Sequence, residues 1–525
     1  MILIRNLRLE TGEPLDALRQ KAAKKLRVPE GDITECFPVK RSLDARKKND
    51  IHYTCSAAVS LRRGEERAMQ RAGKDAAPYT PPVYEIPRVD GRERPVVVGF
   101  GPAGMFAALL LAKAGAKPIV LERGQAVEQR CAAVEAFRRG GELNPESNVQ
   151  FGEGGAGTFS DGKLNTGTHD RRMFWVLREF AAHGAPESVT FDAKPHIGTD
   201  VLVDVVKSIR EEILALGGEI RFETKLSGLV TENGALCAAR LSHAGVTETL
   251  PCRKLILAVG HSARDSFEML YELGIEMERK PFSMGVRIEH KQEAVDLAQY
   301  GRARGELPAA DYSLNVHLPD GTSAYTFCMC PGGKVFAAAS EAGGIVTNGM
   351  SYSKRDGENA NAALLVTLHT EDFPGEGVLA GMCWQREIER AAYAYTGSYQ
   401  APAQLVGDFL KKRPSTGPGA VTPSYEPGVC WGDLRRVLPA RITDVLQNAI
   451  PELGRKLRGF DDPAAVLTGP ETRSSSPVRI LRDEGLQSPT LRGLYPCGEG
   501  AGYAGGITSA AVDGLRCAEA VLREQ

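Results

Sequence analysis

The sequence predicts an α/β fold with a Rossmann-like dinucleotide-binding domain, an inserted mixed-sheet domain and a small N-terminal α+β module. Three observations support this prediction. Residues 95–124 follow the order strand, glycine turn, helix and second strand. Residues 491–522 repeat a strand, a glycine turn and a helix much later in the chain. Between these two units, parts of residues 281–462 alternate apolar and polar side chains, as strands of a separate sheet do.

Composition narrows the class of protein. The 525 residues include 42% hydrophobic and 25% charged side chains, which is ordinary for a soluble globular protein. The net charge of −1 gives no overall attraction to nucleic acid or anionic membranes. Eleven cysteines without a secretory signal argue against a disulfide scaffold and for a reducing compartment. No stretch approaches the ~20 apolar residues of a membrane span, so we expect a cytoplasmic protein.

Residues 1–75 predict a small basic module with strands over 1–9, 33–43 and 51–61 and a helix over 14–26. Residues 1–90 carry 18 Lys and Arg against 13 Asp and Glu. This excess indicates either a docking surface for an acidic partner or RNA, or a solvated face. We favour the solvated face, because no nucleic-acid motif accompanies the charge. Several prolines over 76–92 indicate a semi-rigid linker.

The first strand–helix–strand unit carries the motif G-x-G-x-x-G at Gly99, Gly101 and Gly104. The first glycine permits a tight turn, the second lets the backbone approach a pyrophosphate, and the third lets the helix pack on the sheet. The helix that follows presents N–H groups to the phosphates. Glu122 ends the second strand, where a carboxylate accepts hydrogen bonds from ribose hydroxyls. These residues predict a dinucleotide site without choosing between FAD and NAD.

A glycine-rich segment follows over residues 151–170, with six glycines in twenty positions. We interpret it as a loop whose backbone approaches a ligand closely, and not as a flexible surface loop. Beyond it we expect a helix over 198–216 and a strand over 219–230. Further strands are expected over 237–240 and 247–250, and a buried strand over 254–259 before a sharp turn at Gly260.

The inserted region contains a Cys-x-Cys pair, Cys328 and Cys330. Its interpretations are a redox dithiol, half of a metal site, or small buried residues before a tight turn. No second Cys or His pair follows at zinc-finger spacing nearby, so we expect no metal. Taking the two thiols to project to opposite faces of a strand, we expect no easy disulfide between them.

Two arginines, Arg473 and Arg479, flank a serine-rich turn. They predict either a clamp for an anionic group or ion pairs with acids such as Glu471 and Asp483. Further on, a glycine–acid turn around Glu499 leads into a helix over 508–522. The N-terminus of that helix would face an electron-rich cofactor edge and stabilise negative charge there.

The segments LERG, FGEGGAGTFSDGKL, MGVRIEH, FCMCPGG, NGMSYSKRDG, ETRSSSPVRI and YPCGEGAGYAGGITSAAVDG resemble the bacterial "uncharacterised FAD-dependent dehydrogenase" family. That family shares the FAD fold of the glutathione reductase superfamily, the two-dinucleotide-binding-domain flavoproteins. Geranylgeranyl-reductase-like flavoproteins are more distant. The resemblance covers nearly the whole chain. It implies an FAD-binding domain over residues 93–280 and 466–525, interrupted by a substrate or cap domain over 281–465.

The resemblance also implies FAD as cofactor, held by residues of the first turn, the glycine-rich loop and the terminal turn. The residues that it assigns to FAD are Gly99, Gly101, Pro102, Ala103, Gly104, Glu122, Arg123, Gly155, Ala156, Gly157, Ser160, Gly162, Lys163, Leu226, Gly260, Gly498, Glu499, Gly505, Gly506, Ile507 and Thr508. Disulfide reductases of the superfamily add a second complete strand–helix–strand unit with G-x-G-x-x-G for NAD(P)H and a Cys-x-x-x-x-Cys pair, and this sequence has neither. We therefore expect NADH or NADPH only as a transient electron donor.

These observations predict an FAD-dependent oxidoreductase acting on a small organic substrate. The alternatives are a flavin-dependent tRNA- or RNA-modifying enzyme that uses the basic module, and a flavin-bearing protein without turnover. Residues of the substrate pocket are proposed at Arg287, His290, Cys328, Cys330 and Arg473. The sequence leaves open the substrate, the electron donor, the direction of electron flow and the oligomeric state.

Overall fold

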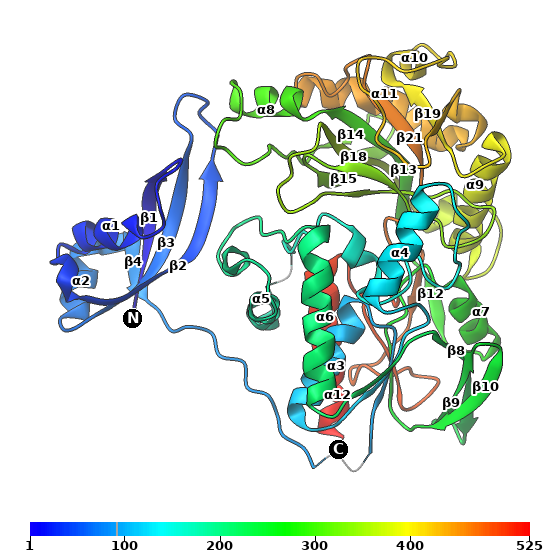
Figure 1. The fold of residues 1–525 in the computed structure, drawn as a ribbon, viewed down its shortest axis with the longest axis horizontal. Coiled ribbons are helices and arrows are strands. Elements are labelled where there is room, and N and C mark those ends of the chain that lie inside the picture. The colour runs from blue at the N-terminus through cyan, green and yellow to red at the C-terminus, as the bar shows by residue number, and fades with distance from the viewer. Residues whose placement is uncertain (91–92, 168, 525) are drawn as a thin grey trace.

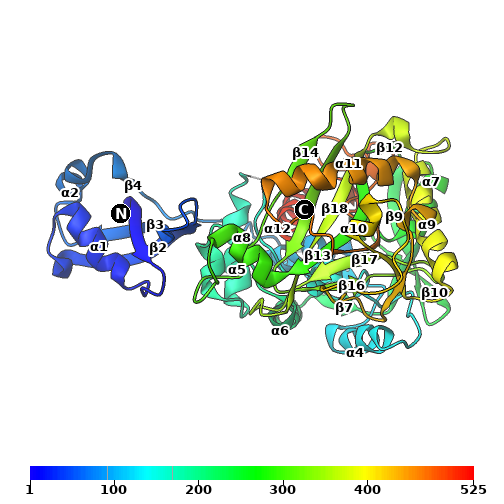
Figure 2. The same cartoon turned by 90° about the horizontal axis from the view of Figure 1, so that it is seen from above.

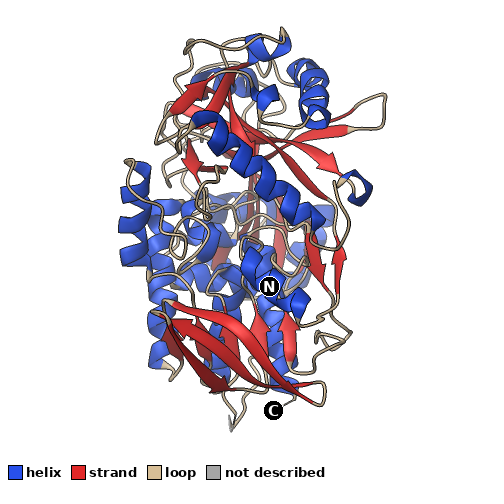
Figure 3. Cartoon of the chain, turned by 90° about the vertical axis from the view of Figure 1, so that its right-hand side faces the viewer, coloured by secondary structure: helices blue, strands red, loops and turns tan. Residues whose placement is uncertain are grey.

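The computed structural model describes residues 1–90, 93–167 and 169–524. Outside the described residues lie positions 91–92 of the predicted linker, 168 of the glycine-rich loop and 525 of the predicted C-terminal part. The N-terminal module lies to one side of the main body in two perpendicular views (Figures 1 and 2). Within the main body, the inserted sheet lies above the nucleotide-binding part (Figure 3).

The N-terminal module is a four-stranded antiparallel sheet in the order β2-β3-β1-β4, covered by two helices. Its elements are β1 (Ile2–Glu10), α1 (Ala17–Leu26), β2 (Ile33–Asp44), β3 (His52–Leu61), α2 (Glu65–Ala72) and β4 (Ala76–Pro78). The sequence analysis did not anticipate α2 or β4. Strand β4 occupies the first three residues of the predicted linker, because it pairs with the free edge of β1. The module has its own apolar core.

A five-stranded parallel sheet, in the order β23-β11-β5-β6-β7, forms the centre of the main body. Its strands are β5 (Val96–Val98), β6 (Ile119–Leu121), β7 (Glu219–Arg221), β11 (Leu255–Leu257) and β23 (Leu494–Pro496). Neighbouring side chains alternate between two apolar cores. Val97 packs with the helices on one face, whereas Val96 and Val98 pack with a second sheet on the other. The predicted Rossmann-like α/β fold is confirmed.

Helices cover the first face of the parallel sheet. They are α3 (Pro102–Ala114), α5 (Arg172–Ala182), α6 (Thr199–Ala215) and α12 (Ile507–Arg523), with α4 (Val127–Arg138) at the side. Helix α3 begins at Pro102, where the missing N–H leaves no hydrogen bond unmade, and it ends at Gly115 in the left-handed conformation. Helices α3 and α12 lie side by side, so the two elements that the sequence predicted to contact one dinucleotide are neighbours.

An antiparallel sheet covers the other face, together with α7 (Arg264–Glu272). Its strands are β8 (Thr224–Glu232), β9 (Ala235–His243) and β10 (Val246–Pro251). The single strand expected over residues 219–230 is therefore wrong. Glu223 adopts the left-handed conformation (φ 52°), which turns the chain out of the parallel sheet and into the antiparallel one.

The inserted domain contains a seven-stranded mixed sheet in the order β14-β15-β18-β13-β21-β19-β20. Its strands are β13 (Phe282–Lys291), β14 (Asn315–His317), β15 (Ser323–Cys330), β18 (Asn359–Leu368), β19 (Ala401–Leu405), β20 (Val429–Trp431) and β21 (Val466–Glu471). Its helices are α8 (Gln292–Tyr300), α9 (Ala380–Thr396), α10 (Val406–Leu410) and α11 (Ala440–Lys456). The hairpin of β16 (Lys334–Ala337) and β17 (Thr347–Met350) adds a small second sheet.

The chain enters and leaves the inserted domain through two paired strands, β12 (Met277–Arg279) and β22 (Val478–Ile480). Strand β21 pairs with β13 and β19 inside the inserted sheet. The boundary predicted at residue 466 therefore differs from the structure, in which the chain returns to the nucleotide-binding part only after β21. The apolar strand 466–471 completes the middle of a sheet and is buried throughout.

The N-terminal module touches the main body through its β2–β3 hairpin. Arg41 donates two hydrogen bonds to the carboxylate of Asp192, at 2.7 and 2.9 Å. Lys48 Nζ donates to the carbonyl of Ala298 at 2.8 Å. Several other cations of the module pair with acids of the same module, such as Lys25 with Asp75. None of the helices in the described part of the chain has the length and apolarity to cross a membrane.

Candidate cofactor and active site

One cavity of about 490 Å³ lies where the nucleotide-binding part meets the inserted sheet. It is lined by the first glycine turn, the glycine-rich loop, the terminal glycine–acid turn and the inserted strands β15 and β21. Most residues that the sequence analysis assigned to the cofactor line it. They are Gly99, Gly101, Pro102, Ala103, Glu122, Arg123, Gly155, Ala156, Gly157, Ser160, Gly162, Lys163, Leu226, Gly260, Glu499, Gly505, Gly506 and Ile507.

Gly104, Gly498 and Thr508 lie behind the cavity wall and hold it together. A Cβ on Gly104 would lie 1.9 Å from the carbonyl oxygen of Gly99, so only glycine lets α3 pack this closely on the turn. The N–H of Gly498 donates to Asp513 at 2.8 Å, and the Thr508 hydroxyl donates to the carbonyl of Leu164 at 2.7 Å.

Glu122 is a buried carboxylate at the end of β6. Its two oxygens accept backbone N–H groups from Phe100, Gly124 and Gly152, at 2.8, 2.9 and 2.9 Å. These bonds fix the carboxylate beside the cavity. Because a carboxylate offers about four acceptor positions, Glu122 retains the capacity to bind a hydroxyl.

Arg130 organises the glycine-rich loop, and the sequence analysis missed it. Its guanidinium is fully buried and donates to backbone carbonyls of Asn148, Val149, Glu153 and Gly155. Burial lowers its pKa to about 10, and the guanidinium remains charged. Its place among the apolar residues of α4 was the available signal.

Asp161, Lys163 and Arg355 form an ionic cluster at the cavity wall. Asp161 pairs with Arg355 and lies 3.4 Å from Lys163 Nζ. Burial opposes the charge on Asp161, but the two cations outweigh it and lower its pKa. The pKa of Lys163 is raised, because Asp161 and the nearby thiols outweigh the effect of burial. Among the described residues the buried Nζ has no hydrogen-bond partner.

Glu499 lies at the cavity beside His261, a residue that the sequence analysis did not select. Glu499 accepts the N–H of Gly506 at 3.3 Å, and His261 Nε2 lies 3.7 Å from its other oxygen. Burial raises the pKa of Glu499 to about 7. Burial and the neighbouring arginines lower the pKa of His261 to about 3, so its ring is neutral. His261 Nδ1 is buried without a partner among the described residues.

Arg473 lines the cavity, but its guanidinium is paired. It donates to both oxygens of Glu389, at 3.0 and 2.8 Å, and Arg264 binds the same carboxylate at 2.8 Å. The predicted ion-pair partners of the two arginines were wrong: Glu471 binds Arg287, and Arg479 binds Glu278. Glu389, on α9 of the inserted domain, thus joins Arg473 to Arg264 of α7.

Three of the proposed pocket residues, Arg287, His290 and Cys330, do not line the cavity. Residues 287 and 290 lie on opposite faces of β13, so they could not both point into one pocket. His290 is buried against Phe460 and Tyr312 and bonds the carbonyl of Phe460 at 2.8 Å. Arg287 lies fully buried behind the wall and binds Glu471 through two contacts of 3.0 Å.

Cys328 lines the cavity, and Cys330 lies buried behind it. The expectation that their thiols project to opposite faces is wrong, because residues two apart in a strand share a face. The Cys330 thiol donates to the backbone carbonyl of Cys328 at 3.2 Å. A bulge between Phe327 and Cys330 also bends the strand here.

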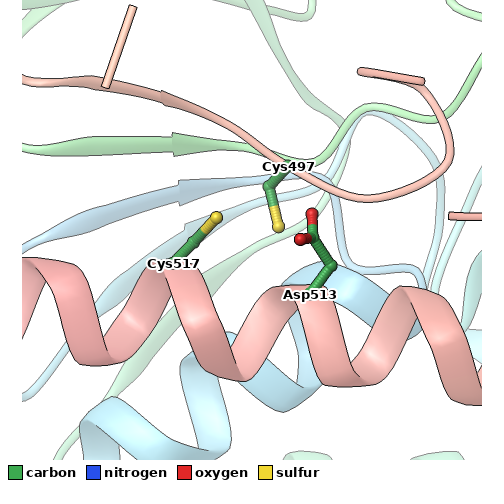
Figure 4. Close-up of side chains that lie close together, drawn as sticks. All are labelled: Cys497, Asp513 and Cys517. Carbon is green, nitrogen blue, oxygen red and sulfur yellow. The ribbon is translucent and has the colours of Figure 1, made fainter. Parts of the chain in front are cut away.

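A separate group of possible metal ligands, the cluster of Cys497, Asp513 and Cys517, lies between the end of β23 and α12 (Figure 4). Its ligand-type atoms lie within 4.8 Å of one another. Both oxygens of Asp513 accept from Arg482, at 2.9 and 2.7 Å, and the pKa of Cys497 is raised by its contact with Cys517 and by burial. A carboxylate paired with Arg482, beside a Cys497 thiol whose proton is held tightly, favours a structural role for the cluster over a metal site.

The cavity fits a dinucleotide. The N-termini of α3 and α12 both reach it, and such termini favour phosphate and other negative charge. Lys163 Nζ and His261 Nδ1, two buried atoms with no hydrogen-bond partner in the described part of the chain, belong to residues that line it.

Three segments of the chain match models of known protein families, and the whole chain matches one curated protein. Residues 93–293 match the family model "Pyridine nucleotide-disulphide oxidoreductase". Residues 281–474 match "FAD-dependent protein, C-terminal domain-like", and residues 1–60 match a domain of unknown function (DUF8436). An uncharacterised protein of Clostridium beijerinckii is 47% identical over 534 residues, covering 100% of this chain and 99% of that protein.

Solved structures also align with the chain. They include the flavin-dependent brominase Bmp2, with a TM-score of 0.38 and 13% identity over 82% of this chain and 79% of that one. A geranylgeranyl bacteriochlorophyll reductase-like protein from Thermoplasma acidophilum aligns with a TM-score of 0.35 and 12% identity, over 82% and 79% of the two chains.

The family matches and the full-length relative confirm the predicted resemblance and its cofactor, FAD. The chain and its Clostridium relative therefore belong to one family of FAD-dependent proteins. In this family a pyridine nucleotide-disulphide oxidoreductase domain is joined to an FAD-dependent C-terminal domain.

Proposed function

We propose that this protein is an oxidoreductase that uses FAD to transfer an electron pair between NADH or NADPH and a small organic substrate. One observation carries the proposal. A single cavity runs from the first glycine turn, at Gly101, to the inserted strands, at Cys328 and Asn348. A dinucleotide held at the glycine turn would therefore end against side chains of a different domain.

The residues that face the cavity suit this arrangement. The N-terminus of α3 would bind the pyrophosphate, and Glu122 would accept hydrogen bonds from a ribose. At the other end the N-terminus of α12 and Lys163 would stabilise negative charge that develops on the flavin during reduction. FAD supplies the redox chemistry, and the protein supplies binding, orientation and charge.

The substrate would bind beside the inserted strands. Tyr312, Phe327 and Met329 give this part of the cavity an aromatic and apolar lining. The Asn348 side-chain oxygen accepts from Arg287 at 3.1 Å, so its Nδ2 is the atom able to donate to a substrate. These residues favour a small, partly apolar molecule with a hydrogen-bond acceptor.

The test is an absorbance spectrum of the purified protein, followed by anaerobic addition of NADH and then NADPH. We expect flavin bands near ~450 nm that bleach with one of the two nucleotides. Asn348→Ala should leave this bleaching unchanged and slow the subsequent reoxidation by an active substrate. A spectrum without flavin, even after addition of FAD, would contradict the proposal. Flavin bands that neither nucleotide bleaches would contradict the proposed donor.

A further inference from the structure

Cys328 and Cys330 form a contact pair at the point where the inserted sheet meets the cavity. Cys328 is half-buried and lines the cavity, whereas Cys330 is fully buried behind it. The Cys330 thiol donates to the carbonyl oxygen of Cys328 at 3.2 Å, and each of the two thiols shifts the pKa of the other. Two free thiols in contact, one of them open to a cavity, are the starting point for a reversible disulfide.

The backbone supports closure of this pair. In a regular strand, Cα atoms two residues apart are roughly 6.6 Å apart, close to the upper limit of about 6.8 Å for a disulfide. Here the strand is bulged between Phe327 and Cys330, and Cys328 adopts the left-handed conformation (φ 42°), which turns the chain out of the regular strand at Cys328. Arg287 holds this bend, because its Nη1 donates to the carbonyl of Cys328 at 3.0 Å.

The charges around Cys328 favour its thiolate. The neighbouring Cys330 side chain lowers the pKa of Cys328, and Lys163 and Arg287 add to the effect. Cys328 and burial raise the pKa of Cys330, so a proton is held more tightly at Cys330 than at Cys328. The acids that oppose the thiolate are Asp161, Glu471 and Glu499. A thiolate is the form of cysteine that reacts with disulfides and other electrophiles.

The pair also lies beside the elements assigned to the flavin. Lys163, from the glycine-rich loop, interacts electrostatically with both thiols. Glu499, from the terminal glycine–acid turn, interacts with Cys328. Cys497 and Cys517 provide an internal contrast, since their contact pair includes Asp513 and no left-handed residue.

We propose that Cys328 and Cys330 are a dithiol–disulfide redox pair that exchanges two electrons with FAD. The proposal rests on the proposed function only in that FAD is bound in this cavity. In the oxidising direction, the S–S bond forms as the Cys330 S–H bond breaks. Two electrons and that proton pass to oxidised FAD, which becomes its reduced anion. The reverse step opens the disulfide and returns the proton to Cys330. The inserted domain thereby supplies a second electron-carrying group beside the flavin.

The first test maps the thiols directly. The purified holoprotein is equilibrated with glutathione and glutathione disulfide at several ratios, quenched in acid, alkylated and digested. Mass spectrometry then shows whether the peptide with both cysteines carries two alkyl groups or an internal disulfide. We expect reversible conversion of this pair, while Cys497 and Cys517 stay alkylated at every ratio. A pair that stays fully alkylated, or that gains only glutathione adducts, would overturn the proposal.

The second test couples the pair to the flavin. Protein oxidised at the pair is desalted, its flavin is reduced anaerobically by light with EDTA, and the thiols are mapped as before. We expect the disulfide to open in wild type and in the control variant Cys383→Ser, whose thiol is exposed elsewhere. Cys330→Ser should show no internal disulfide at all. A disulfide that survives flavin reduction would overturn the exchange. Because no nicotinamide is used, this result is independent of the proposed donor.

A third measurement tests Lys163 as a positioning residue for the thiolate. In Lys163→Gln we expect alkylation of Cys328 at neutral pH to slow by about tenfold, with the pH profile displaced upward. Lys163→Arg should restore the profile, because it keeps the charge. An unchanged profile in Lys163→Gln would show that Lys163 has no such role and would remove the electrostatic support from the pair.

Discussion

Gly104→Ala tests the geometry on which the proposed FAD site depends. The added methyl group would lie 1.9 Å from the carbonyl oxygen of Gly99 and 3.3 Å from Val97. Restoring an ordinary contact requires the helix and the turn to separate by about 1.5 Å, a form of overpacking that typically destabilises by about 1–3 kcal/mol. Alanine favours a helix over glycine by about 1 kcal/mol, which offsets part of this destabilisation.

The displacement moves the N–H groups of α3 that would bind the pyrophosphate. Since 1.4 kcal/mol corresponds to about tenfold in affinity, we expect FAD to bind about 10- to 100-fold more weakly. The assay is titration of FAD into the flavin-free protein, followed by flavin fluorescence. Gly417→Ala is the matched control, because its Cβ would meet no described atom within 4 Å. A Gly104→Ala protein that binds FAD as tightly as wild type would refute the reasoning.

Three further perturbations test other parts of the structure. Glu389→Ala removes the carboxylate that two buried arginines share and leaves Arg264 with its 3.3 Å ion pair to Glu341. We expect urea unfolding to show a loss of about 3–5 kcal/mol; a loss below about 1 kcal/mol would contradict the pairing. Burial raises the pKa of Glu499 to about 7, so the protonated form stabilises the fold at low pH and this stabilisation is lost as pH rises. Between about pH 5 and pH 8, Glu499→Gln should therefore lose less stability than wild type. Equal slopes of unfolding free energy against pH in the two proteins would argue against the raised pKa of Glu499. Arg41→Ala should leave the melting temperature nearly unchanged, because its partly exposed ion pair with Asp192 contributes about 0–1 kcal/mol. Arg41→Ala and Asp192→Ala should each speed proteolysis of the linker, and an unaltered cleavage rate would count against docking through this pair.

Features encoded by local spacing were predictable from the sequence. The G-x-G-x-x-G turn, the acid at the end of β6 and the glycine–acid turn before α12 each depend on residues close together in the chain. The elements around them were placed within a few residues for the same reason. Their meeting at one cavity follows from the parallel sheet, whose strand ends gather at one edge.

Pairings between distant residues were not predictable. Arg473 has several acids near it in sequence, but it pairs with Glu389 on helix α9, far away in the chain. The buried position of Arg130 depends on carbonyls of a loop whose path only the fold determines. Left-handed residues such as Cys328 and Glu223 were missed because nothing in their residue type signals that conformation.

The two-part construction of the parallel sheet has a consequence for synthesis of the chain. Strand β23 and helix α12 belong to residues 494–523, while β5 and α3 belong to residues 96–114. The N-terminal module has its own core and can fold while translation continues. The nucleotide-binding part must instead wait, with one edge strand and one covering helix missing, until the whole inserted domain has left the ribosome. Cofactor loading is thus a late event, and a chain that stops before residue 494 would expose the apolar face of α3 and be a substrate for quality control.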